Sequence, residues 1–400
     1  MHPKLPKGSR VAGIACGLKP SHKLDLSLIV SDHPATAAGV STQNLVCAAP
    51  VPFDRSVTPA EDVRMVLINA GIANACTGER GLEDARAMAD AVLDAVPPQK
   101  GFKRGQALVM STGVIGHFLP MDTLKAGITN IVKELGTSQE CIHNAVTAIL
   151  TTDTHEKVAS ATVEINGKKA TIWGMAKGAG MIGPNMATML ITVISDLAIN
   201  ATMAQAALKD VAERTFNCIS VDGHMSTNDT LVFLANGMSD VIIGNNEQFE
   251  IFKQGLYDVC ETLAREIPND GEGAFHLVTL NVEGLKTRDD ARKIAKQIAE
   301  SPLVKTAIHG ADPNWGRIVS AAGYAGVPFN PDNVNLWVNG FKLFENGAPA
   351  PFDAKEVSKS MADNREVEII LTFKEGSESI RFWTTDLSEE YIHINADYTT

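Results

Sequence analysis

The segment Lys177–Leu190 holds the residues with the clearest chemical potential, because a lysine and several glycines there precede a threonine, Thr188. A threonine hydroxyl is a weak nucleophile unless a base lies beside it, and making the threonine N-terminal supplies that base. The free α-amino group, whose ordinary pKa is about 7.7–8.0, then accepts the hydroxyl proton. This chemistry requires scission between Ala187 and Thr188. A turn that enters a buried strand at Thr188 explains the same residues without chemistry.

Two other short motifs could assist such a nucleophile. Lys177 stands beside the glycine turn Gly178-Ala-Gly180, where it could hold a carboxylate near backbone N–H groups. The order of residues is not that of a phosphate-binding P-loop. Thr112 and Gly113 follow an apolar run, and a hydroxyl and a glycine N–H at a strand end can form an oxyanion hole. A solvated lysine and a plain turn are the alternative readings.

Several polar segments suit either the wall of a site or a network of turns. They are Thr151-Thr-Asp-Thr154, Asn217–Thr230 and Asp270-Gly-Glu-Gly273, in which Glu272 lies between two glycines. Asn395 and Thr400 fall in the C-terminal tail, where disorder is the default. The alternation Tyr391-Ile-His-Ile394 nevertheless predicts a strand that docks there.

Short strand-like runs alternate with amphipathic helices, and this pattern predicts a mixed α/β fold built in layers. Asn166-Gly167 predicts a hairpin, whereas Ser111-Thr-Gly113 reads as a turn. The predicted strands are 24–31, 63–69, 106–110, 161–165, 170–173, 188–195, 275–282, 335–338, 366–373 and 379–383. The predicted helices are 82–96, 121–135, 138–151, 203–216, 249–267 and 288–300.

Composition excludes several classes of partner. The formal charge of -12 argues against nucleic acid or an anionic membrane surface, since both favour basic proteins. No apolar run reaches the roughly 20 residues that cross a bilayer, and the N-terminus lacks the apolar core of a signal peptide. The six cysteines are scattered without zinc-like spacing, so we expect no metal and buried, reduced thiols in the cytoplasm.

Taken together, nine segments in order along nearly the whole chain resemble the ornithine acetyltransferase (ArgJ, glutamate N-acetyltransferase) family. One such motif would be weak, but nine in the family's order are highly specific. The segments are Thr42-Gln-Asn44 with Ala48–Val51, Asn69–Gly78, Ser111–Gly116, Thr151–Thr154, Lys177–Leu190, Ser226–Asp229, Asp270–Gly273, Asp312–Arg317 and Ile394–Thr400.

The resemblance implies a cytoplasmic enzyme that cleaves itself into an α chain, 1–187, and a β chain, 188–400. Its fold would be the layered α/β sandwich of self-cleaving N-terminal-nucleophile proteins, with a smaller C-terminal α/β portion. Thr188 would take the acetyl group from N-acetylornithine and pass it to glutamate by a ping-pong route in arginine biosynthesis. No cofactor is implied, although acetyl-CoA is a further candidate donor. Two α and two β chains would form a heterotetramer.

The resemblance also assigns residues to roles. Thr112 and Gly113 would form the oxyanion hole, and Lys177 would bind the substrate α-carboxylate. Glu272 would bind the α-ammonium or carry a proton. The residues that line the amino-acid site would be Thr151, Lys177, Thr188, Glu272, Asn395 and Thr400.

Two segments depart from the family pattern near these presumed loops. The chain has Ala274-Phe-His276 where Ala-Thr-Lys is usual, and Asp222-Gly-His-Met-Ser226 where many members have Asp-Gly-Asp-Thr-Ser. Both departures bear on substrate range, including the use of acetyl-CoA. The alternatives to the acetyltransferase are an amidase or peptidase-like hydrolase on the same self-cleaving scaffold, and an uncleaved amino-acid-binding protein.

Overall fold

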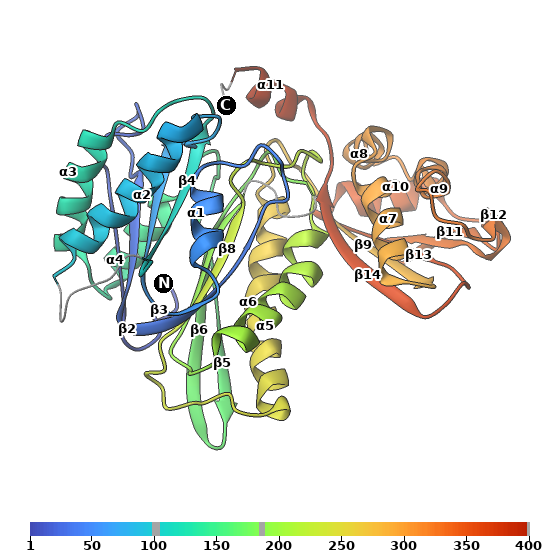
Figure 1. Ribbon diagram of the computed structural model, residues 1–400. Helices are drawn as coiled ribbons and strands as arrows, with labels where there is room; N and C mark the ends of the chain where they lie inside the picture. The colour runs from blue at the N-terminus through green and yellow to red at the C-terminus, as the bar shows by residue number, and fades with distance from the viewer. Residues whose placement is uncertain (98–104, 184–188, 398–400) are drawn as a thin grey trace.

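The computed structural model describes residues 1–97, 105–183 and 189–397, which form two β-sheets with helices packed against them (Figure 1). In the first sheet the strand order is β4-β3-β2-β8-β7-β6-β5, and β1 pairs with β2. Its strands are β1 (Ser9–Ile14), β2 (Leu26–Ser41), β3 (Ala60–Ile72), β4 (Ala107–Val114), β5 (Lys157–Ile165), β6 (Lys168–Lys177), β7 (Leu190–Ser195) and β8 (Thr230–Ala235).

The long strand β2 folds this sheet over on itself. Its first part pairs with β3, its last part pairs with β8, and the ladder is irregular between Val30 and Ala37. The inner faces of the two halves therefore pack against each other in one buried cluster. That cluster joins Ile29, Ile68 and Met110 from one half to Trp173, Leu190, Ile194 and Val232 from the other.

Helices cover the outer face of each half, which makes four layers in the order helix, sheet, sheet, helix (Figure 1). Helices α2 (Gly78–Ala95) and α3 (Met121–Ile131) pack on β2, β3 and β4. Helix α6 (Asn246–Asn269) packs on β5 and β6, and α5 (Ala201–Arg214) packs beside it on β2, whose last part pairs with β8. The buried side of α6 repeats at helical spacing, through Phe252, Leu256, Val259, Leu263 and Ile267. Two further helices are α1 (Pro50–Val57) and α4 (Gln139–Ala148).

Strand β7 lies inside the folded sheet, antiparallel to β6 and parallel to β8. All six of its residues are buried, because Leu190 and Ile194 face the inner cluster while Ile191 and Val193 face the outer one. A strand buried on both faces is a rigid support. This rigid strand begins at Leu190, two residues after position 188.

The C-terminal part forms the second sheet, in the order β12-β11-β10-β13-β9-β14. Its strands are β9 (Leu277–Leu285), β10 (Asn335–Val338), β11 (Phe341–Glu345), β12 (Ala348–Pro349), β13 (Glu366–Thr372) and β14 (Glu378–Thr385). Its helices are α7 (Arg288–Ala299), α8 (Pro302–His309), α9 (Trp315–Gly323) and α10 (Ala354–Ala362). After β14 the chain returns to the first sheet as α11 (Glu389–Asp397) (Figure 1).

The predicted layered α/β sandwich with a smaller C-terminal α/β portion is confirmed. Two local predictions were wrong. Ser111–Gly113 continues β4 beside β3, and Tyr391–Ile394 belongs to helix α11 rather than to a strand. The expectation of buried thiols holds only for Cys218 and Cys260, since the other four cysteines are partly or fully exposed. Within residues 1–97, 105–183 and 189–397, no helix is both long enough and apolar enough to cross a membrane.

Candidate functional site

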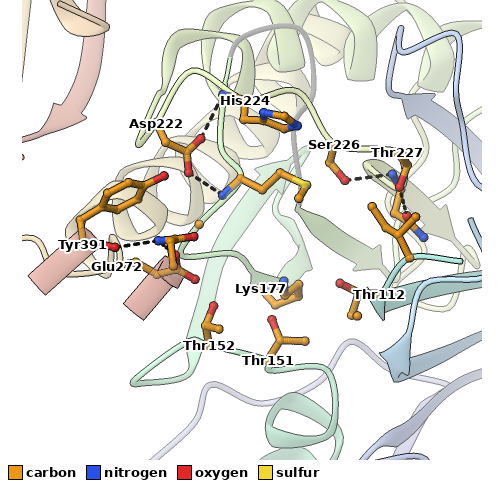
Figure 2. Close-up of a pocket in the computed structure, with 16 residues that line it drawn as sticks. Thr112, Thr151, Thr152, Lys177, Asp222, His224, Ser226, Thr227, Glu272 and Tyr391 are labelled. Atoms are coloured by element: carbon orange, nitrogen blue, oxygen red, sulfur yellow. Dashed lines mark hydrogen bonds between the residues drawn. The ribbon is translucent and has the colours of Figure 1, made fainter. Parts of the chain in front are cut away.

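One cavity of about 180 Å³ collects most of the residues that the sequence singled out. Figure 2 shows them around Lys177, with side chains contributed by both halves of the folded sheet and by α11. The volume is below the roughly 300–1,000 Å³ of sites for drug-sized ligands, so the cavity suits one small molecule. The predicted residues that line it are Thr112, Gly113, Thr151, Lys177, Glu272 and Asn395.

Strand β4 carries Thr112 and Gly113 to the wall of this cavity. Gly113 has a φ of 127°, and a Cβ atom there would lie 2.3 Å from the backbone carbon of Gly71 on β3. Only glycine fits at that approach. Asn228 fixes the strand end further, because its Nδ2 donates hydrogen bonds to the carbonyls of Ser111 (2.7 Å) and Ala73 (2.6 Å). The backbone beside Thr112 is therefore held in one position.

Lys177 ends β6 and is buried, with 2% of its surface exposed. Burial lowers the pKa of its ammonium group, and the negative charge of Asp153 opposes that shift. Burial alone would raise the pKa of Asp153, but the charges of Lys177 and Lys157 bring it well below its usual range. Asp153 is therefore an anion that keeps a buried cation in the cavity wall.

Asp153 also shapes the loop that brings Thr151 and Thr152 to the cavity. Its carboxylate accepts hydrogen bonds from the backbone N–H of Thr151 (3.1 Å) and of Gly178 (2.6 Å). Lys157 Nζ, fully buried, donates to Asp153 at 2.8 Å and to Asp270 at 2.5 Å. Both Thr151 and Thr152 line the cavity, so the geometry does not single out one of them.

Glu272 enters the cavity where Gly180 leaves room for it. A Cβ atom on Gly180 would lie 2.2 Å from Glu272 Oε2. The Glu272 backbone N–H donates to Ala179 O at 2.9 Å, and Asn395 Nδ2 donates to Glu272 Oε2 at 3.0 Å. The cavity thus presents a cation, Lys177, and a carboxylate, Glu272, a pairing that suits an amino acid.

Asp222, His224 and Tyr391 are among the cavity residues that the sequence did not single out as site candidates. Asp222 accepts hydrogen bonds from the backbone N–H groups of Met181 (2.7 Å) and His224 (3.0 Å), as Figure 2 shows. The backbone N–H of Ile182 also donates to it, at 3.0 Å. Burial raises the pKa of Asp222, against those bonds, and burial with the nearby Asp222 raises the pKa of Tyr391. For Asp222 and His224, the sequence signal available was the high density of polar residues in Asn217–Thr230.

Of the two departures from the family pattern, only one reaches the cavity. His224 lines it. The ring of His276 instead turns to Asp386, with Nδ1 3.2 Å from Oδ2, and its Nε2 lies 3.2 Å from Met361 O. His276 therefore belongs to the support of the C-terminal segment.

Three predicted residues, Ala187, Thr188 and Thr400, lie outside the described residues. The chain resumes at Met189, whose backbone N–H donates to Asp229 Oδ1 at 2.8 Å. Leu190 pairs with Lys177 in the ladder between β7 and β6. Position 188 is thus two residues before a point that lies directly opposite Lys177.

One group in the described parts of the chain has donor atoms arranged as in a metal site, and it is not in the cavity. His2, His143 and Glu156 place their donor atoms within 4.8 Å of one another. Glu156 already receives both imidazoles, at 3.1 and 2.6 Å, and the Thr147 hydroxyl at 2.6 Å. Hydrogen bonding therefore accounts for this cluster.

Comparison with known proteins gives full-length relatives. The ArgJ family model matches residues 10–400. "Arginine biosynthesis bifunctional protein ArgJ" of Rhodopirellula baltica is 47% identical over 399 residues, which are 99% of this chain and 96% of that protein. The protein of the same name from Dehalococcoides mccartyi is 45% identical, with 99% and 96% covered.

A solved structure gives a similar result. The crystal structure of the arginine biosynthesis bifunctional protein ArgJ of Bacillus halodurans is 35% identical, with a TM-score of 0.50. The match covers 52% of this chain and 97% of that one. On the family match and the full-length relatives, this chain belongs to the ArgJ family.

Proposed function

We propose that this protein is an acetyltransferase of arginine biosynthesis that moves the acetyl group of N-acetylornithine to glutamate. The observation that carries the proposal is one small cavity that combines Lys177, Glu272 and the Thr112–Gly113 strand end beside the entry to β7. Family membership and relatives named for arginine biosynthesis support the choice of substrates.

The chain first cuts itself in this proposal. The Thr188 hydroxyl attacks the Ala187 carbonyl carbon, the peptide C–N bond breaks, and water hydrolyses the resulting ester. The products are a carboxylate on Ala187 and a free α-amine on Thr188, giving chains 1–187 and 188–400. The match to the Bacillus halodurans chain supports this division, since 97% of that chain aligns with only 52% of this one. Residues 188–400 are 213 of the 400 residues, a similar share.

Acetyl transfer then uses the new amine as the base. The amine takes the Thr188 hydroxyl proton while the oxygen attacks the acetyl carbonyl of N-acetylornithine. The Thr112 hydroxyl and the Gly113 N–H stabilise the oxyanion. The amide C–N bond breaks, the proton passes to the departing nitrogen, and ornithine leaves an acetyl ester on Thr188.

Glutamate reverses these steps, because its α-amine attacks the ester and releases N-acetylglutamate. Lys177 binds the α-carboxylate of each substrate in turn, and Glu272 binds the α-ammonium or carries its proton. Thr151, Asn395 and Thr400 complete the amino-acid site. Transfer instead of hydrolysis requires water to be kept from the ester until glutamate arrives.

We also propose a second acetyl donor and an assembly of the cleaved chains. Acetyl-CoA serves as a second donor, consistent with relatives that are named bifunctional. The cleaved chains assemble as two α and two β chains in the cytoplasm.

Intact mass spectrometry tests the proposal directly. Fresh, active protein is expected as two fragments that meet between Ala187 and Thr188, and incubation with N-acetylornithine should add one acetyl group to the fragment that begins at Thr188. Active protein that remains a single 42.7 kDa chain would refute it.

A product assay separates transfer from hydrolysis. With both substrates present, N-acetylglutamate should form in step with ornithine. Free acetate as the main product would favour the hydrolase reading, and binding without turnover would favour an amino-acid-binding protein.

A further inference from the structure

His224 lines the cavity with a side chain to which the proposed function gives no role. Five of the lining residues that the structure describes have an ionisable side chain, namely Lys177, Asp222, His224, Glu272 and Tyr391. The proposed function uses Lys177 for the α-carboxylate of the substrates and Glu272 for the α-ammonium. Hydrogen bonds within the protein show which of the other three can still bind a ligand.

Asp222 and Tyr391 are occupied by contacts with each other and with the backbone. The Asp222 carboxyl accepts the backbone N–H groups of Met181, Ile182 and His224, at 2.7, 3.0 and 3.0 Å. The Tyr391 hydroxyl forms a further hydrogen bond with the same carboxyl. A carboxylate offers roughly four acceptor sites, so these contacts occupy Asp222. Asp222 therefore supports its own loop and α11.

The ring of His224 is available to a ligand. Its backbone N–H is bonded to Asp222, but no hydrogen bond or ion pair reaches the exposed ring from the described part of the chain (Figure 2). The loop that carries the ring is closely packed, because a Cβ atom on Gly183 would lie 2.6 Å from the backbone carbon of Gly223. A fixed backbone thus presents an unpartnered imidazole at the cavity wall.

The two proposed substrates differ in the charge at the end of their side chains. N-acetylornithine ends in an ammonium group and glutamate in a carboxylate, yet both must bind in turn in one cavity of about 180 Å³. A fixed charge there would attract one substrate and repel the other. A histidine suits both, because neutral imidazole has an acceptor nitrogen, imidazolium has two donors, and the two forms interchange near neutral pH.

We propose that His224 is the specificity-determining residue for the far end of the substrate side chain. Its neutral ring accepts a hydrogen bond from the ammonium group of N-acetylornithine, and its protonated ring donates one to the side-chain carboxylate of glutamate. The ring exchanges this proton with water as one substrate replaces the other. The inference rests on the proposed function, because it assigns a partner to the two substrates named there.

Charge variants of His224 test this. His224→Asp should raise kcat/KM for N-acetylornithine about threefold and lower kcat/KM for glutamate about threefold, the size expected of an ion pair that water partly screens. His224→Lys should have the opposite effect on each substrate. Steady-state kinetics separates the two values, because each half-reaction of a ping-pong enzyme has its own kcat/KM. A loop that merely lost its shape would lower both values together.

His33→Asp and His33→Lys are the matched controls. His33 is an exposed histidine on β2 and is not among the residues that line the cavity. The same charge changes at this position should leave the ratio of the two kcat/KM values unchanged.

A second measurement uses the wild-type protein and covers the case in which a variant does not fold. At a fixed pH near 7, the ¹³C NMR signal of the His224 ring should move towards the protonated form with glutamate and towards the neutral form with ornithine. The reason is that a nearby carboxylate favours the imidazolium ion and a nearby ammonium group disfavours it. Neither ligand carries an acetyl group, so no transfer takes place during the measurement.

The outcomes separate this inference from the proposed function. If the wild type makes N-acetylglutamate but the two His224 variants change both kcat/KM values in the same direction, or not at all, the role of His224 is wrong and the proposed function stands. Ring signals that move in the same direction with both ligands would also overturn that role. If the wild type transfers no acetyl group, the proposed function fails, and the role of His224 fails with it.

Discussion

At the scale of single residues, Lys177 makes the cavity suitable for a carboxylate, because it is a buried cation whose charge Asp153 maintains. Lys177→Met keeps the length of the side chain and removes the charge. We expect KM for N-acetylornithine and for glutamate to rise about tenfold or more, since a hydrogen bond to a charged group contributes about 1.5–3 kcal/mol. Steady-state kinetics with both substrates measures this. Lys23→Met, at an exposed position, is the control, and an unchanged KM in Lys177→Met would reject the carboxylate contact.

A second residue-scale prediction concerns Gly180, which makes room for the carboxylate of Glu272. Gly180→Ala would place a methyl group 2.2 Å from Glu272 Oε2 and so displace the carboxylate or the loop. We expect kcat/KM to fall at least tenfold while the melting temperature changes little, because the clash lies in a cavity wall. Gly323→Ala is matched in chemistry, since nothing lies within 4 Å of its new methyl group and its φ is not positive. Equal activity of both variants would show that the position of Glu272 is unimportant.

At the scale of elements, α11 closes the cavity with Tyr391 and Asn395, although none of its residues is buried. Polar contacts hold it instead. Ser388 Oγ donates to Gly273 O at 2.6 Å, and a Cβ atom on Gly273 would lie 2.3 Å from Tyr391 N. The segment that leads into it is anchored by Asp386, which accepts the backbone N–H groups of Phe275 and His276 and the ring of His309.

This anchor should respond to pH. The hydrogen bond with Asp386 raises the pKa of His276 against its partial burial. A raised pKa in the folded state means that the stabilisation is fully present below the unfolded value, about 6.5, and is lost as pH rises through the folded value. Burial raises the pKa of Asp386, but the hydrogen bonds from His276 and His309 bring it below its usual range, so its stabilisation is lost only in acid.

The prediction is that His276→Gln lowers the melting temperature more at pH 5.5 than at pH 8.5. Scanning calorimetry at both pH values measures the difference, with His22→Gln at an exposed position as the control. A gap between wild type and His276→Gln that is the same at both pH values would contradict the ion pair.

An element could be predicted from the sequence where neighbouring residues along the chain determine its backbone conformation. Asn166-Gly167 fixed a hairpin because both residues adopt positive φ, 53° and 75°. Ser111–Gly113 looked like a turn, but pairing with β3 keeps it in the strand. Tyr391–Ile394 alternates like a strand, yet no neighbouring strand is paired with it, and the acidic pair Glu389-Glu390 favours a helix start. Both predictions were wrong because a local pattern does not show which segments pair as strands in the folded chain.

The same limit applies to the cavity. The polar segments along the chain could be recognised as motifs, so six of the residues that line the cavity were predicted. The burial of Asp229 and the turn of His276 away from the cavity depend on neighbours from distant segments, such as Met189 and Asp386. Single residue types carry no signal for such contacts.

At the scale of the whole molecule, the proposed cut falls within a fold whose two parts are interleaved. Strand β6 precedes the cut and pairs with β7 after it, from Ile172 opposite Ser195 to Lys177 opposite Leu190. Strand β2 likewise pairs with β8, from Thr36 opposite Ala235 to Ser41 opposite Thr230. Both main apolar clusters also draw side chains from the two parts.

We therefore expect the cleaved fragments, residues 1–187 and 188–400, to stay together in native buffer. Separation would break two ladders and expose both apolar clusters, and burial of apolar surface contributes roughly 25 cal/mol per Å². Native mass spectrometry should show the fragments in equal number in one particle, and denaturant should separate them in a single cooperative transition. Thr188→Ala, which cannot be cut, should elute at the same position on gel filtration as the cleaved protein. Release of either fragment without denaturant would contradict the interleaved fold, because no part of the chain could leave without unpairing a strand.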